Sequence, residues 1–187
     1  FVSIVAHELR NPLMVVREAA MLVLDGLAGP ISDEQKNYLK MMHQTSAQLV
    51  GITNDLLDLA KIESGKLVLN LEKVDLCSLV SQSCEGIGLR AHKKGIAIVK
   101  QFAVPKIEIM VDYDKITQVM TNLLSNALKF TEKGSITAEI KDLGDEVCCA
   151  VKDTGTGISD ENLLKLFNKF MQFARRAKPR QNGPGRG

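Results

Sequence analysis

The sequence predicts an α+β protein of two domains, a helical hairpin over residues 1–64 and an α/β domain over residues 65–187. Two patterns carry this prediction. Up to about residue 59, apolar residues recur every three or four positions, which is the period of amphipathic helices. From Leu67 onward, short alternating segments typical of strands appear between further helical segments. The patterns meet at Ser64-Gly65, where the glycine interrupts the helical period.

The first helix is expected over residues 1–27. Its apolar stripe consists of Phe1, Ile4, Val5, Leu9, Leu13, Val16, Ala20, Val23 and Leu27. Pro12 lies inside this run, and because its ring removes one backbone hydrogen bond, we expect a local bend. The segment GLAGPIS at residues 26–32 then contains two glycines and a proline. It should end the helix and turn the chain.

The second helix is expected to begin at Ser32, because Ser32 and Gln35 have the spacing of a capping box. Its apolar stripe is close to a heptad repeat and consists of Leu39, Met42, Leu49, Ile52, Leu56 and Leu59. Two such helices joined by a short turn form a hairpin that leaves apolar surface on one face. We therefore expect a homodimer in which two hairpins form a four-helix bundle.

The remaining elements alternate between strands and helices. A half-buried strand is expected around Leu67, Leu69 and Leu71, followed by a helix at about 76–92 and a strand at about 95–102. A helix at about 113–130 comes next, and its predicted buried face consists of Ile116, Val119, Met120, Leu123, Leu124, Ala127 and Leu128. The last two strands are SITAEIKDL and EVCCAVKD, with a turn at residues 143–145 between them. This order predicts a mainly antiparallel sheet covered by helices.

Composition narrows the possible partners and setting. Hydrophobic residues make up 45% and charged residues 25%, the net charge is +2, and aromatic residues are only 4%. Such a chain has few platforms for stacking on bases, so no nucleic acid partner is expected. The four cysteines include no C-x-x-C pair, which favours reduced thiols and a cytoplasmic location. No apolar run is long enough to cross a bilayer. The chain opens inside a helical pattern, so we expect a fragment whose only membrane anchor would lie in other segments.

The segment AHELRNPL at residues 6–13 places polar and charged groups in a mostly apolar helix. A buried face does not favour His7, Glu8 and Asn11, so either they occupy an exposed stripe or they do chemistry. A lone histidine is more often an ordinary surface residue, and that interpretation applies to His43 and His92. The sequence around His7 leaves both possibilities open.

A second polar group lies on the helix expected at 113–130. Asn122 and Asn126 are four residues apart and therefore lie one turn apart on a common stripe, with Lys129 near the same side. Carboxamide oxygens are hard ligands that suit Mg²⁺, and an ammonium suits phosphate. Helix surfaces also carry asparagine and lysine without any function, so this stripe alone does not establish a binding site.

Two further stretches could contact a ligand. In VKDTGTGIS, Asp153 ends a strand, where it could accept a hydrogen bond from an exocyclic amine such as that of adenine, or form an ordinary Asx turn. Gly155 and Gly157 could allow close approach to a ligand or a positive φ. Further on, Leu166, Phe167, Phe170 and Phe173 predict a short amphipathic helix, followed by a basic segment rich in glycine and proline. That basic segment could attract phosphates or simply be a solvated loop.

Four of these segments together resemble a known family. H-E-L-R-N-P at residues 7–12, N-L-L-S-N-A-L-K-F at 122–130, D-T-G-T-G-I at 153–158 and L-F-N-K-F at 166–170 occur in this order. They are similar to the phosphoacceptor, Asn-rich, first Gly-rich and Phe boxes of bacterial-type sensor histidine kinases. The resemblance implies that the second domain is an α/β-sandwich ATP-binding domain of the histidine kinase, gyrase and chaperone type.

The resemblance also implies roles on the first helix. His7 would accept the γ-phosphoryl group of ATP on an imidazole nitrogen, and Glu8 would act as the general base. Asn11 would help to place a water molecule that dephosphorylates the partner. That partner would be a response-regulator receiver domain, which takes the phosphoryl group on an aspartate.

In the second domain, the resemblance implies a site for ATP and Mg²⁺. Asn126 would hold the metal, with Asn122 and Lys129 on the phosphate side, and Asp153 would contact the adenine amine. Gly155, Gly157, Phe167 and Phe170 would shape the pocket. The family has a second Gly-rich box after this region, whereas this sequence ends at GPGRG. We therefore expect a catalytic domain that is incomplete at its C-terminus and binds ATP weakly by itself.

Two alternative functions are compatible with parts of this pattern. ATP hydrolases of the gyrase and chaperone type carry a glutamate four residues before the metal-binding asparagine, but this sequence has Asn122 there, which cannot act as a general base. A non-catalytic dimerisation scaffold, or a relative that works chiefly as a phosphatase, is the second alternative. The presence of His7, Glu8, Asn126 and Asp153 argues against an inactive scaffold, whereas phosphatase activity is compatible with Glu8 and Asn11.

Overall fold

The computed structural model describes residues 2–165, except for the side chains of residues 2–4 and of His7. Contacts divide the chain into two compact units, and the division falls between Leu69 and Asn70. We call residues 2–69 the hairpin unit and residues 70–165 the α/β unit. The domain boundary predicted at residues 64–65 lies five residues before this division and stays a prediction.

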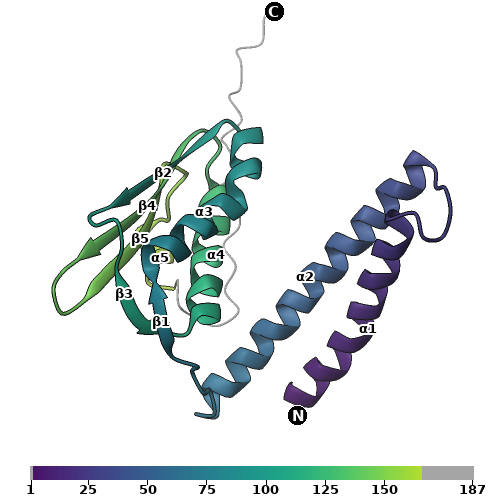
Figure 1. The fold of residues 1–187 in the computed structure, drawn as a ribbon, viewed down its shortest axis with the longest axis horizontal. Helices are drawn as coiled ribbons and strands as arrows, with labels where there is room; N and C mark the ends of the chain where they lie inside the picture. Colours follow the sequence, from purple (N-terminus) through teal and green to yellow (C-terminus); the bar gives the residue numbers. More distant parts are fainter. Residues whose placement is uncertain (1, 166–187) are drawn as a thin grey trace, which may run out of the picture. The chain divides into compact units, whose positions relative to one another are not determined.

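The hairpin unit consists of helices α1, Val2–Leu24, and α2, Asp33–Glu63, which pack along each other (Figure 1). Helix α1 continues through Pro12 and ends three residues earlier than predicted. The turn that follows needs glycine, since Gly26 and Gly29 have φ values of +84° and +97°. The predicted start of the second helix is confirmed: the Gln35 N–H donates to the Ser32 hydroxyl at 3.2 Å, and the Ser32 N–H donates to the Gln35 side chain at 2.8 Å.

A single hairpin has a small buried interior. Among its described side chains, the buried ones are those of Ala6, Ala20, Ser46 and Thr53, all of them small. Much of the predicted heptad stripe is exposed instead, with Met42, Leu49 and Ile52 at 52%, 42% and 54% exposure. A single hairpin therefore leaves several large apolar side chains of the heptad stripe in contact with water.

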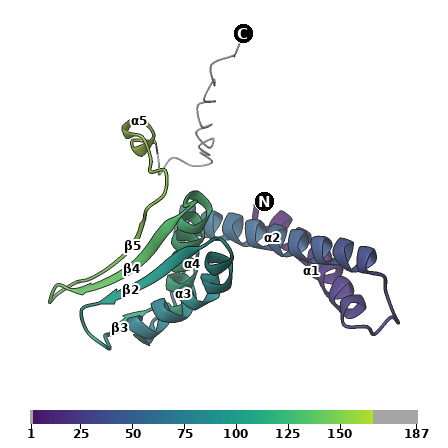
Figure 2. The ribbon, with the colours of Figure 1, turned by 90° about the horizontal axis from the view of Figure 1, so that it is seen from above.

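The α/β unit contains three longer strands and two long helices. The sheet strands are β2, Ile96–Phe102, β4, Gly134–Asp142, and β5, Val147–Asp153, and helices α3, Leu76–Lys93, and α4, Tyr113–Phe130, cover one face (Figures 1 and 2). These five elements confirm the sequence prediction to within one or two residues. A short helix, α5, Asp160–Leu163, follows the sheet.

The core of the α/β unit lies between the helices and the sheet. Its fully buried side chains come from α3, α4 and β4 and include Leu79, Val80, Leu124, Leu128, Ile136 and Ile140. Inward-facing residues alternate along β4, as expected for a strand with one face packed on helices. This core fixes α4 against the sheet, and α4 carries the predicted metal ligand.

Strand order is β2–β4–β5, with β2 and β4 parallel and β4 and β5 antiparallel. The parallel pair follows from the long connection between β2 and β4, which contains α4, because parallel neighbours need such a crossover. The turn between β4 and β5 was predicted and is present, closed by the Leu143 N–H donating to the Glu146 carbonyl at 2.8 Å. The sheet is therefore mixed, with less antiparallel pairing than the sequence predicted.

One predicted strand is wrong in position. Residues 67–71 form no strand, and the strand in this region is β1, Glu72–Asp75, which pairs with β3, Glu108–Val111, a strand that the sequence analysis missed. The register pairs Glu72 with Val111, and Asp112 then begins α4 as its N-cap. Residues before Glu72 thus have no partner strand to pair with. Leu69 and Leu71 alternate in sequence but are both exposed.

Candidate functional site

The first candidate site lies on α1. Its backbone is helical at His7, Glu8 and Asn11, so His7 and Asn11, four residues apart, share one side of the helix. The side chains of Glu8 and Asn11 are exposed. The His7 side chain lies outside the described part of the structure. The helix therefore presents two of the three predicted groups to solvent.

An inter-helix contact lies next to this group. The Arg10 guanidinium donates a short hydrogen bond to the Asn54 side chain on α2. The Arg10 Nε is buried and has no hydrogen-bond partner among the described residues. No local signal in the sequence points to Arg10, because the two residues of this contact are 44 positions apart. This bond ties α1 to α2 one turn beyond His7.

The second candidate site begins on α4. Asn122, Asn126 and Lys129 are all exposed on its surface, while Met120, Leu124, Ala127 and Leu128 face the core. The Lys129 Nζ lies 5.1 Å from the centre of the Phe130 ring, within cation–π range. The structure thus keeps the predicted polar stripe in contact with solvent.

Two apolar residues of α4 depart from the prediction. Val119 and Leu123 were expected in the core, but they are 51% and 43% exposed. The buried arc of the helix is narrower than the sequence pattern, since only one side faces the sheet. Leu123 follows Asn122 directly and lies three residues before Asn126, so the polar stripe is bordered by exposed apolar surface. That combination suits a ligand with both apolar and charged parts.

Asp153 ends β5 beside the end of α4. Its Oδ1 atom accepts a hydrogen bond from the Gly155 N–H at 2.8 Å and lies 3.5 Å from the hydroxyl oxygen of Thr131. Thr131 is fully buried, whereas Asp153 is exposed. The carboxylate is therefore oriented by two groups and remains accessible at the surface. The hydrogen bond to Gly155 is also the Asx turn that the sequence left open as an alternative.

The two glycines of this segment are needed for different reasons. A Cβ atom on Gly155 would lie 2.6 Å from the Phe130 carbonyl oxygen and 2.6 Å from Asp153 Oδ1, which no side chain tolerates. Gly157 has open space around it but a φ of +65°, which disfavours other residues. Gly155 therefore allows β5 to approach the end of α4 closely, and Gly157 allows the chain to turn away.

The other predicted site residues fall beyond the described region. Phe167 and Phe170 lie outside residues 2–165, as does the basic segment that follows them. None of the described helices is long and apolar enough to cross a membrane.

Comparison with known proteins assigns the two parts of the chain to known domains. Residues 1–65 match the His Kinase A (phospho-acceptor) domain, and residues 111–187 match the histidine kinase-, DNA gyrase B- and HSP90-like ATPase. These two domains, in this order, are those of a sensor histidine kinase core.

Individual relatives extend this result. The Non-motile and phage-resistance protein of Caulobacter vibrioides is 34% identical over all of this chain and 23% of its own length. The Circadian input-output histidine kinase CikA of Synechococcus elongatus is 32% identical over all of this chain and 25% of its own length. A crystal structure of full-length ShkA in complex with AMPPNP is 30% identical and superposes with a TM-score of 0.71, covering 86% of this chain and 34% of that one. The chain thus spans about a quarter of the length of these two curated relatives.

The donor set of the second candidate site fits a metal that is bound mainly through a nucleotide. Among the residues that the structure describes, no group of three or more histidine, cysteine, aspartate or glutamate side chains could hold a metal ion. Mg²⁺ in phosphate-transferring sites takes one or two protein oxygens and fills its other positions with phosphate oxygens and water. The exposed carboxamide of Asn126 can supply such an oxygen.

Proposed function

We propose that this chain carries the ATP-dependent autokinase reaction of a sensor histidine kinase. An imidazole nitrogen of His7 attacks the γ-phosphorus, the bond from that phosphorus to the bridging oxygen breaks, and ADP leaves with the bonding electrons. The phosphoryl group then passes to an aspartate of a response-regulator receiver domain. The observation that carries the proposal is the junction of Asp153, Gly155 and the end of α4, because it builds an accessible, oriented carboxylate beside the exposed Asn122–Asn126–Lys129 stripe.

Each residue has a task that its surroundings permit. Asp153 accepts a hydrogen bond from the adenine amine, and its contact with the Gly155 N–H holds the carboxylate in place. Lys129 and Asn122 contact the phosphates, and Asn126 holds Mg²⁺, which when bound offsets negative charge on the phosphates. Glu8 accepts the proton that the imidazole loses as it becomes phosphorylated. Gly157 gives the turn beyond the site, and Phe167 and Phe170 complete the nucleotide-binding set.

The hairpin unit acts as the dimerisation element in this proposal. The exposed residues Met42, Leu49 and Ile52 follow the heptad stripe of α2. Covering them with a second hairpin produces a four-helix bundle with an apolar interior. The four cysteines are free, which suits a cytoplasmic location for this part of the protein.

The reaction is tested by incubating the chain with γ-labelled ATP and Mg²⁺. Phosphohistidine is stable to alkali and labile to acid, so label of that kind on the chain is expected. His7→Gln and Asp153→Asn should each abolish it, whereas the control His43→Gln, on α2 of the same hairpin, should retain it. Label that survives His7→Gln would place the phosphoacceptor elsewhere.

If the chain by itself takes up no label, an intact histidine kinase catalytic domain is added as the source of nucleotide-binding activity. Label that then arrives at His7 supports the phosphoacceptor role of the hairpin. A His7 that stays unlabelled under these conditions contradicts the kinase proposal and favours a scaffold.

Phosphatase activity toward the partner is a second candidate function, favoured by the exposed Asn11 on the side of α1 that also carries His7. Asn11→Ala should spare the labelling of His7 and slow the dephosphorylation of the receiver domain. A parallel loss of both activities would show that Asn11 supports the helix rather than the hydrolytic step.

A further inference from the structure

We propose that Lys94 is a positioning residue for the adenine-binding end of the site, acting through the last turn of α4. No part of the sequence pattern points to it, and its side chain donates to a backbone carbonyl of α4. The inference rests on the proposed function, since it assigns Lys94 to the same nucleotide site.

Helix α4 ends abruptly. Thr131, which follows Phe130, has an extended conformation with φ −91° and ψ 124°, and its N–H still bonds to the Ala127 carbonyl at 2.9 Å. The last carbonyls of a helix have no partner within the helix and need one from outside. The Lys94 Nζ supplies it for Leu128, donating to that carbonyl at 2.6 Å. An ammonium at a helix C-terminus is also favoured by the helix dipole.

The turn that Lys94 contacts is the turn on which the site rests. The Phe130 carbonyl oxygen lies so close to Gly155 that a Cβ there would be at 2.6 Å, and the Thr131 hydroxyl lies 3.5 Å from Asp153 Oδ1. Residues 128–131 therefore receive the Lys94 bond and also hold the Asp153–Gly155 segment. Because these contacts leave no free space, a shift of the helix end must move Asp153.

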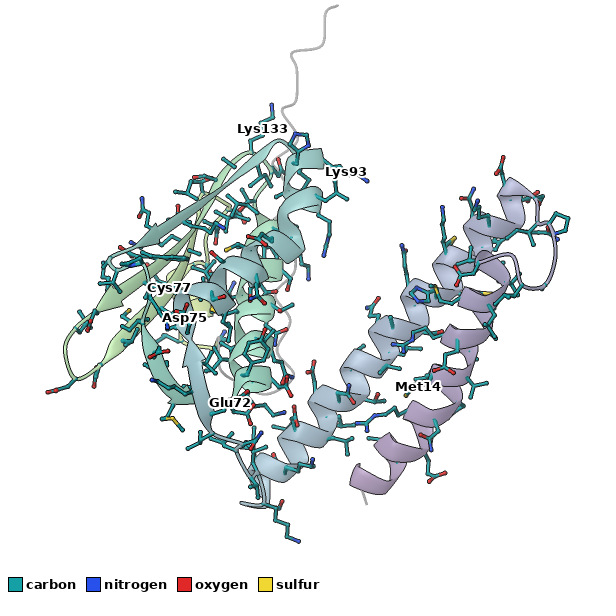
Figure 3. The ribbon with its side chains drawn as sticks, viewed as in Figure 1. Met14, Glu72, Asp75, Cys77, Lys93 and Lys133 are labelled. Atoms are coloured by element: carbon teal, nitrogen blue, oxygen red, sulfur yellow. The ribbon has the colours of Figure 1, made fainter. Side chains whose placement is uncertain are left out.

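Lys94 is itself firmly held. It lies directly after α3, where its own N–H donates to the Ala91 carbonyl and the N–H of the following Gly95 donates to the His92 carbonyl, each at 3.0 Å. Two residues later β2 begins, and there Ile96 pairs with Gly134, the first residue of β4. Figure 3 shows the neighbouring Lys93 at the end of α3 and Lys133 before β4 at the same end of the α/β unit. The bond from Lys94 to Leu128 thus ties the end of α4 to the frame formed by α3 and the sheet.

This placement predicts an effect on base recognition in addition to stability. Adenine offers an amine to the Asp153 carboxylate, whereas guanine places a carbonyl oxygen at the corresponding ring position, which repels a carboxylate. A displaced Asp153 should therefore bind ATP less well and distinguish it less from GTP. A lysine that only stabilised the fold would leave that ratio unchanged in the folded protein.

The test compares Lys94→Met and Lys94→Arg with the matched control Lys93→Met, an exposed lysine one residue earlier. Calorimetry gives the dissociation constants for ATP and GTP, and hydrogen exchange reports on residues 127–133 and 153–157. We expect Lys94→Met to weaken ATP binding roughly tenfold, as for the loss of one charged hydrogen bond, and to lower the ATP-to-GTP preference. Exchange should rise in both segments. Lys94→Arg should restore much of the preference, and Lys93→Met should change neither quantity.

An unchanged preference together with unchanged exchange in Lys94→Met would overturn the inference, as would an equal effect of Lys93→Met. Failure of the proposed function gives a different result, because the unmodified protein would then bind neither nucleotide. In that case hydrogen exchange still tests the positioning role of Lys94. Faster exchange at residues 153–157 in Lys94→Met supports the positioning role, and unchanged exchange contradicts it.

Discussion

The two units of this chain bury different kinds of side chain. Of the hairpin side chains that the structure describes, two alanines, a serine and a threonine are buried, and large apolar residues of α2 remain exposed. In the α/β unit, leucine and isoleucine side chains from α3, α4 and β4 are completely buried in one core. Because burial of large apolar side chains is the main favourable term in folding, the α/β unit carries its own stability, whereas the hairpin needs a second apolar surface.

Because of this difference, substitutions in the two units should affect stability in different ways. Substitutions in the hairpin should act through association, so their effect depends on protein concentration. Substitutions in the α/β unit should act on the folding of one chain and be independent of concentration.

Leu49→Asp should abolish the dimer. The Leu49 side chain is 42% exposed in one hairpin and lies on the heptad stripe. A second hairpin would therefore bury an unpaired charge at this position, which costs several kcal/mol. Light scattering should show a monomer, and the thermal transition of the hairpin should move to lower temperature. Gln44→Asp, at an exposed position of the same helix, is the control and should stay dimeric. A dimeric Leu49→Asp would place the interface on another surface.

Leu124→Ala should destabilise only the α/β unit. Leu124 is completely buried, so its truncation leaves a cavity and costs about 2–5 kcal/mol. Denaturant unfolding should show a lower midpoint for that unit at every protein concentration. The adjacent Leu123→Ala is the control, since a side chain that is 43% exposed loses much less. Equal effects of the two substitutions would mean that Leu123 is covered in solution.

Ser32→Ala should weaken the hairpin modestly. It removes the hydroxyl that accepts from the Gln35 N–H and so breaks the capping box at the start of α2. Loss of such a cap costs about 1 kcal/mol. The thermal transition of the hairpin should fall while that of the α/β unit stays constant. Ser64→Ala, after the end of the same helix, is a control for loss of a hydroxyl, and a larger effect there would contradict the importance of the cap.

Sequence reasoning succeeded where the signal is local. The capping box at Ser32 and Gln35, the two long helices of the α/β unit and the turn at residues 143–146 follow from patterns within a few residues of each other. The prediction was wrong where the position of a strand depends on its partner strand. Leu67, Leu69 and Leu71 alternate like a strand, but β3 is only four residues long and ends where α4 begins, so no partner is available to them.

The same distinction applies to the candidate site. The roles of His7, Asn126 and Asp153 come from motifs, and the structure adds how Asp153 and Gly155 meet the end of α4. The contacts of Thr131 with Asp153 and of Lys94 with Leu128 join residues 22 and 34 positions apart. No periodic pattern connects such residues, and only the packing of α3, α4 and the sheet brings them together.

The smallest expected effect concerns Glu108 on β3. Hydrogen bonds from Lys73 and Lys106 lower the pKa of Glu108 from 4.5 to about 2. A carboxyl group whose folded pKa lies below its unfolded value stabilises the protein above pH 4.5, and this contribution is lost as the pH falls toward 2. Glu108→Gln should thus be slightly less stable than the unmodified chain at pH 7, with a difference that shrinks over that window. The effect is small because these ion pairs are exposed and screened by solvent.

Chemical unfolding at a series of pH values measures this difference in the transition of the α/β unit, with Glu146→Gln in the β4–β5 turn as the control. A difference that grows on acidification would show that Glu108 binds its proton more tightly in the folded protein than in the unfolded one.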